Sequence, residues 1–230
     1  MTSLRLLLLI GVALACRHPA LPAADAAERA NELLRSACER ALASLAPDAA
    51  GARRIPLELP AELAPALRAL RGTGMGSRVD AFEAALERAA RLALQASRPW
   101  LESAAAGFAP ADPEVLLSGP DDALAGAFRS AHEADLRLQL AASSERVLTE
   151  AGAFTALENV RAGAQRLPLR RSVEPDLVSL VTEQALLDFF DALAEQEKSL
   201  RREREAASGG YGETPNSGPL MGSEAMGGSR

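Results

Sequence analysis

The chain has 230 residues, a formal net charge of −6, only 3% aromatic residues and two cysteines. Its longest basic runs are arginine pairs, so it is not built to neutralise a row of phosphates, and no nucleic-acid partner is expected. Two cysteines cannot build a disulfide framework. With so few aromatic side chains, the core has to consist of Leu, Val and Ala, which requires closely packed helices.

Residues 1–15 have the pattern of a bacterial export signal. Arg5 is followed by an uncharged apolar run from Leu6 to Ala15, and Ala13-Leu14-Ala15 is a small-x-small cleavage pattern directly before Cys16. The run is too short to cross a bilayer, which needs about 20 apolar residues. We therefore expect it to be removed and not to serve as an anchor.

The residues before Cys16 resemble the lipobox of bacterial lipoproteins, in which the cysteine is acylated and becomes the new N-terminus. Lipoboxes usually carry Leu where this chain has Ala13. Residues 16–24 are then the lipidated cysteine and a short tether. In many such lipoproteins an aspartate directly after the cysteine marks retention in the inner membrane, so Arg17 at this sorting position implies the periplasmic side of the outer membrane. The alternative is ordinary signal cleavage, which would leave a soluble periplasmic protein.

Helical periodicity over residues 25–207 predicts an all-α fold, a single multi-helix bundle-like domain. The first helix, about 25–45, carries Cys38 on its apolar stripe, where a free thiol behaves as a small buried hydrophobe. In residues 55–59 apolar side chains occupy every second position of a segment broken by prolines, which predicts a short extended strap over the core. A short helix over 61–70 then ends in the glycine-rich turn 72–76.

The remaining elements are punctuated by capping residues, prolines and glycines. Ser77 is expected to cap a helix that Pro99 ends or kinks. Pro113 to Leu117 forms a one-turn helix, and a long helix follows, with acidic residues in its first turn. Gly152 separates it from the next helix, and the last helix, or pair of helices, starts at Asp176. Residues 208–230 are rich in Gly and Ser and predict a disordered C-terminal tail.

Several short segments, in this order and spacing, resemble the landmarks of the exported all-helical bacterial family catalogued as domain of unknown function 4197. The resemblance spans about residues 25–204, and the chain departs from the family around Ala127, Ala131 and His132 and in its C-terminal tail. The family has no agreed activity, so the resemblance implies fold and export but no chemistry. The landmark segments are Arg54-Ile55-Pro56-Leu57, Leu67-Arg68-Ala69-Leu70, Val79-Asp80-Ala81-Phe82-Glu83, Gly119-Pro120-Asp121-Asp122-Ala123, Phe128-Arg129 and residues 195–201.

Asp121, Asp122, His132 and Asp135 are weak candidates for a functional surface. Adjacent helical residues point about 100° apart, so the two aspartates do not face each other, and a capping role at the helix N-terminus is favoured over paired acid/base or metal chemistry. His132 is the only histidine of the folded domain, and Asp135 at i+3 could orient its ring. No nucleophile accompanies them, so a surface histidine is favoured.

Two acidic stripes on different helices could meet as a carboxylate metal site. Metal-binding bundles of this kind also use Glu-x-x-His pairs, which this chain lacks, so solvated faces are expected. Glu197 and Arg201 form an i, i+4 pair in a charge-laced helix, which indicates exposure. No metal ligand, cofactor or catalytic residue is predicted. The stripes are Asp80, Glu83 and Glu87, and Asp188, Asp191 and Glu195.

These observations favour a non-catalytic structural or partner-binding module that is exported and held at the membrane by an N-terminal lipid, with an unknown envelope protein as its partner. One alternative is a carrier of an apolar small molecule in a pocket between helices. Another is an enzyme with an unrecognised carboxylate/His site. The expected pocket walls are Phe82, Trp100, Phe108 and Phe128.

Overall fold

The computed structural model of the protein describes residues 23–46, 63–166 and 175–209. These residues form seven helices and no strand, which confirms the predicted all-α fold. Cys16, the expected strap and residues 210–230 of the expected tail lie outside the described residues. The helices are α1 (Ala23–Ser44), α2 (Ala64–Gly72), α3 (Gly76–Ala106), α4 (Pro113–Ser118), α5 (Ala123–Glu150), α6 (Ala153–Ala164) and α7 (Leu177–Gly209).

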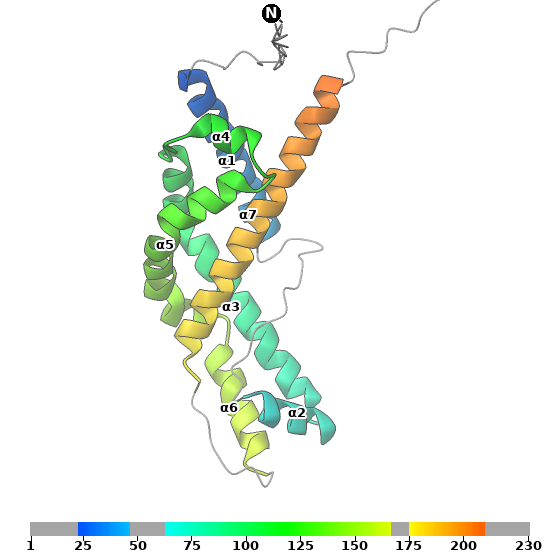
Figure 1. Cartoon of the computed structure of the whole chain (residues 1–230). Coiled ribbons are helices and arrows are strands. Elements are labelled where there is room, and N and C mark those ends of the chain that lie inside the picture. Colours follow the sequence, from blue (N-terminus) through cyan, green and yellow to red (C-terminus); the bar gives the residue numbers. More distant parts are fainter. Residues whose placement is uncertain (1–22, 47–62, 167–174, 210–230) are drawn as a thin grey trace, which may run out of the picture.

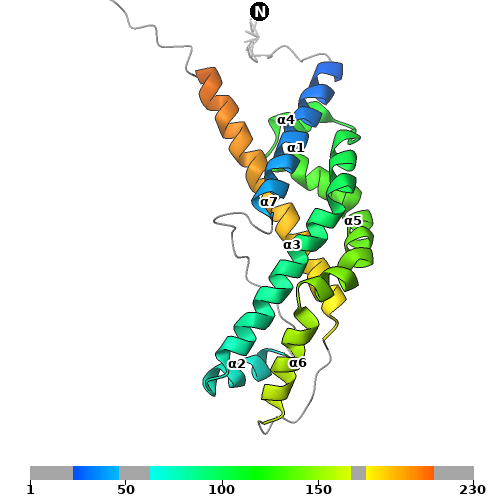
Figure 2. The same ribbon diagram turned by 180° about the vertical axis from the view of Figure 1, so that it is seen from behind.

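The helices build an elongated molecule around α3, which packs against α1, α2, α5, α6 and α7 (Figure 1). α5 and α7 lie side by side along one half of α3, and α1 packs against both α3 and α7. α2 and α6 flank the other half of α3 (Figure 2). The start of α1, α4 and the end of α7 therefore share one end of the molecule, while α2 and α6 form the opposite end.

Leucine, alanine and a few phenylalanines fill the core, as the low aromatic content predicts. The largest fully buried side chains are Phe82, Phe128 and Phe189 together with many leucines. The stripe of α1 is buried and includes Cys38. Burial raises the pKa of the Cys38 thiol from 9.0 to about 12, and nearby Glu102 adds to the rise. This thiol is therefore neutral at physiological pH, as expected of a small buried hydrophobe.

The predicted start of α3 is wrong, and Pro99 does not end the helix. The amide of Arg78 already bonds to the carbonyl of Met75, so the helix starts before Ser77, and no side chain caps it. α3 also continues through Pro99 to Ala106. Leu94 and Leu101, which flank the proline, are both fully buried in the same core. Packing on both sides thus outweighs the single backbone hydrogen bond that proline cannot make.

The last helix and the α5–α6 junction follow the sequence signals more closely. Asp176 precedes α7, and its carboxylate accepts a hydrogen bond from the Ser179 amide at 3.0 Å. Gly152 has a φ of +75°, which glycine adopts without strain, and it separates α5 from α6. α7 continues to Gly209, two residues beyond the predicted end of the helical domain at 207. No helix among the described residues is long and apolar enough to cross a membrane.

We expect Gly126→Ala to stabilise the protein more than Gly163→Ala does. A Cβ atom at Gly163 of α6 would lie 2.9 Å from Cδ2 of Leu70 and 3.3 Å from Sδ of Met75, whereas one at Gly126 would meet nothing within 4 Å. Alanine at residue 126 should stabilise the helix by about 0.5–1 kcal/mol. At residue 163 overpacking, which costs about 1–3 kcal/mol, opposes the same gain. Urea denaturation should separate the two variants, and equal stabilisation would contradict the close approach of α6 to the α2–α3 turn.

Candidate functional site

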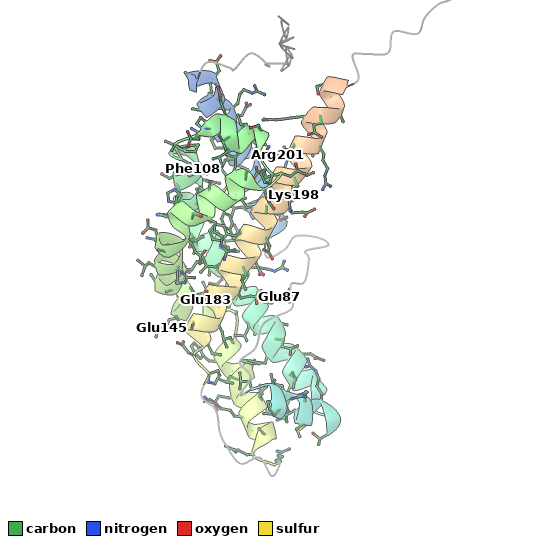
Figure 3. All side chains as sticks on the ribbon, in the orientation of Figure 1. Glu87, Phe108, Glu145, Glu183, Lys198 and Arg201 are labelled. Atoms are coloured by element: carbon green, nitrogen blue, oxygen red, sulfur yellow. The ribbon has the colours of Figure 1, made fainter. Side chains whose placement is uncertain are left out.

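The junction between α4 and α5 lies against α7 and gathers charged side chains that bond to other helices. Figure 3 shows Arg201 and Lys198 of α7 beside α4 and the start of α5. Glu197 precedes Lys198 in the same helix and contacts the first turn of α5. We call Glu197 and Arg201 the α7 clasp.

Glu197 caps α5 from another helix. Its side chain is only 1% exposed, and its carboxylate accepts hydrogen bonds from the amides of Leu124, at 3.2 Å, and Ala125, at 2.7 Å. Amides in the first turn of a helix have no partner within the helix. A negative charge at this position is also favoured by the helix dipole. Glu197 therefore satisfies two backbone donors that would otherwise be buried without a partner.

Arg201 joins this carboxylate to the end of α4. Its side chain is 11% exposed and donates to Oε1 of Glu197 from Nε, at 3.0 Å, and from Nη2, at 2.7 Å. It also donates to the carbonyls of Leu117, at 2.7 Å, and Leu116, at 2.8 Å. These carbonyls belong to the last turn of α4, which lacks partners within its own helix. The α7 clasp therefore holds three helices together, and its predicted exposure is wrong.

The signal for this burial is the helical phase of Glu197. Leu193 and Leu200, at i−4 and i+3, are both buried, so the carboxylate lies on the apolar stripe of α7. An i, i+4 Glu–Arg pair has the same spacing whether it is buried or exposed. Because the clasp bonds to backbone groups, no side-chain pattern in α4 or α5 indicates the contact.

The two predicted aspartates at this junction do not cap α5 through their side chains. Asp122 is the N-cap residue, but its side chain makes no capping hydrogen bond. Its carboxylate instead pairs with Lys198 at 3.0 Å, and this hydrogen bond lowers the pKa of Asp122. Asp121 is exposed. The capping role expected of this acidic pair belongs to Glu197, and the two carboxylates do not converge on a shared site.

His132 lies in an aromatic cluster and not freely on the surface. Its ring centroid is 4.7 Å from that of Phe128, 6.0 Å from that of Trp100 and 6.1 Å from that of Phe108. Asp135 is exposed, and within the described residues it does not hydrogen-bond to His132. The expected orienting pair is therefore not formed, and the half-buried imidazole packs among three rings.

The aromatic residues expected to wall one pocket do not all meet. Phe108 and Phe128 are in edge contact, with centroids 5.6 Å apart, and both pack against His132. Phe82 lies 18 residues before Trp100 in the same helix, which places them about 27 Å apart along its axis. The predicted four-residue wall is therefore wrong, and Phe82 is fully buried in the core.

A buried carboxylate lies between α3 and α7. Asp188 is 5% exposed and accepts a 2.6 Å hydrogen bond from Gln184. Desolvation raises its pKa from 3.8 to about 6, while the hydrogen bond from Gln184 opposes the rise. On α3, Arg91 also opposes the rise and Glu87 adds to it. Arg91 in turn pairs with Glu87 at 3.2 Å.

The acidic stripes are therefore only partly solvated. Asp80, Asp191 and Glu195 are exposed as expected, whereas Asp188 is buried, because it is in phase with the apolar positions of α7. Figure 3 shows Glu87 of α3 beside α7, so the two stripes do approach each other there. Within the residues that the structure describes, no group of three or more His, Cys, Asp or Glu side chains could hold a metal ion.

A further ion-pair network joins α5 to α7. Arg129 and Arg137 both bond to Glu133, at 2.7 and 2.8 Å, and Arg137 also bonds to Glu183 of α7 at 2.8 Å. The guanidinium of Arg129 additionally lies 5.2 Å from the ring centroid of Phe190. Together with the α7 clasp, these contacts use charged side chains to hold helices in place.

Comparison with known proteins identifies the family of the chain. No curated protein matches the chain, and no solved structure does. A family model described as "Protein of unknown function (DUF4197)" matches residues 20–209, which include every described residue. The landmark segments noted in the sequence fall within this match. The chain therefore belongs to the DUF4197 family of proteins of unknown function.

Proposed function

We propose that the protein is an exported, lipid-anchored protein of the bacterial cell envelope, whose helical domain binds a partner and performs no catalysis. The observation that carries the proposal is Cys16, which directly follows the cleavage pattern Ala13-Leu14-Ala15 and an apolar run of signal length. Arg17 at the sorting position favours the periplasmic side of the outer membrane. The partners are then the membrane, through the lipid, and an envelope protein.

The non-catalytic part of the proposal is supported by how the polar side chains are used. Glu197 and Arg201 are bonded to each other and to helix ends, and Asp188 is bonded to Gln184. His132 is packed among aromatic rings. An active site needs a nucleophile, base or electrophile aimed at a shared point. Each of these candidate groups instead faces a partner within the fold.

Cys16→Ser is expected to abolish incorporation of labelled palmitate and to release the protein from membranes. The matched control is Cys38→Ser, because Cys38 is the other cysteine and is buried in α1. This control should keep both label and membrane attachment. Labelling and fractionation of cells that express each variant measure the effect. A mature N-terminus beyond Cys16, or an unmodified Cys16, would contradict the lipid anchor.

A further inference from the structure

We propose that α4 and the segment leading into it form the face of the domain that rests on a zwitterionic lipid surface, with Val115 entering the interface. This inference rests on the proposed lipid anchor at Cys16. It adds the orientation of the domain, the contact residue and the lipid chemistry that this contact suits.

The length of the tether brings one end of the molecule to the membrane. α1 begins at Ala23, seven residues after Cys16. Seven residues span at most about 25 Å, whatever path the chain takes. The 22 residues of α1 extend about 33 Å away from that point. The start of α1 is therefore within reach of the bilayer, and Figures 1 and 2 show α4 beside α1 at this same end.

α4 presents an exposed apolar side chain at this end. Val115 is 65% exposed and is one of three large hydrophobic residues exposed in the described part of the chain. The other two, Leu138 and Phe154, lie on α5 and α6. Ala109 and Ala111, in the segment leading into α4, are also exposed. The lipid interface accommodates such apolar side chains when an anchor already holds the protein there.

The domain holds α4 in a fixed position. Leu116 and Leu117 pack against the core on the inner side, and Arg201 binds their carbonyls. Ser118 also donates to the carbonyl of Glu114 at 2.7 Å. Because α7 fixes α4 in this way, the outward direction of Val115 is set by the fold and does not depend on contact with lipid.

The charges of this face select the lipid. Asp112 and Glu114 are exposed next to Val115 in the chain, and residues 107–118 contain no Lys or Arg. An acidic surface is repelled by anionic headgroups over a distance of about 10 Å at physiological salt. Attraction must therefore come from the lipid anchor and the apolar contact, which suits a zwitterionic surface.

The test places an environment-sensitive fluorophore on the lipidated protein in phosphatidylcholine vesicles. The label is attached at Val115→Cys, with Leu138→Cys as the matched control because Leu138 is 68% exposed. Cys38 is buried and unreactive to the label. We expect the emission of the label at 115 to shift to shorter wavelength and to be quenched by spin-labelled lipid. The label at 138 should remain as it is in buffer.

Each other outcome overturns part of the proposal. Protein that does not float with the vesicles contradicts both the lipid anchor and this orientation. Protein that floats without a shift at 115, or with a larger shift at 138, contradicts the orientation alone. Adding phosphatidylglycerol should weaken the shift at 115, and a stronger shift would overturn the assignment to zwitterionic lipid.

Discussion

Glu197→Gln is expected to lower the free energy of unfolding by about 3–5 kcal/mol, the usual cost of removing one partner of a buried ion pair. The substitution leaves the charge of Arg201 buried without its carboxylate, in a side chain that is only 11% exposed. It also removes one of the two carboxylate oxygens that accept from the amides of Leu124 and Ala125. For a domain of this size the thermal midpoint should fall by about 10 °C.

Glu203→Gln is the matched control for this experiment. Glu203 lies on the same helix and also forms a two-bond contact with an arginine, Arg40, at 2.7 and 3.0 Å. Both side chains are about half exposed, and surface pairs of this kind contribute little to stability. Its midpoint should stay close to that of the parent in thermal unfolding followed by circular dichroism. Equal losses in the two variants would contradict the special role of the α7 clasp.

Asp188→Asn is expected to stabilise the protein at neutral pH and to remove part of its pH dependence. The folded pKa of Asp188, about 6, lies above its ordinary value of 3.8, so the folded state binds the proton more tightly. The stability contributed by protonation is therefore fully present below about pH 4 and is lost as the pH rises through 6. A pKa shift from 3.8 to about 6 corresponds to about 3 kcal/mol of unfolding free energy.

The measurement is the difference in unfolding free energy between this variant and the parent, taken by urea denaturation from pH 4 to pH 8. The difference should grow in favour of the variant up to about pH 7 and then level off. Comparing the two proteins cancels the other carboxylates, such as half-buried Glu133, whose pKa is lowered and whose contribution to stability changes with pH in the opposite direction. Arg91 keeps its partner Glu87 in the variant. A difference that does not change with pH would contradict the buried, proton-binding carboxylate.

Periodicity alone predicted most of the helices. The first helix was expected at 25–45 and α1 spans Ala23–Ser44, because its apolar stripe sets both the phase and the length. Capping and breaking signals were less reliable. Ser77 and Pro99 carry local preferences of about 1 and 3 kcal/mol, which the packing of α3 overcomes.

The candidate site was harder to predict because it depends on contacts between distant parts of the chain. Glu197 is separated by 73 residues from Leu124, whose amide it binds. A backbone amide looks the same at every position of a sequence, so nothing near Asp121 indicates that a carboxylate of α7 completes the turn. The available signal of burial was that Glu197 and Asp188 occupy the same helical positions as buried leucine, valine and alanine residues of α7. The spacing between charged residues does not reveal this.

The α7 clasp also determines when the fold can be completed. Arg201 bonds to carbonyls that precede it by 84 and 85 residues, and Glu197 bonds to amides 72 and 73 residues earlier. A chain that emerges N-terminus first, from a ribosome or a translocation channel, therefore presents α4 and the start of α5 long before their partner groups arrive. Until α7 docks, those backbone groups remain hydrated, and the junction between α4 and α5 cannot become native.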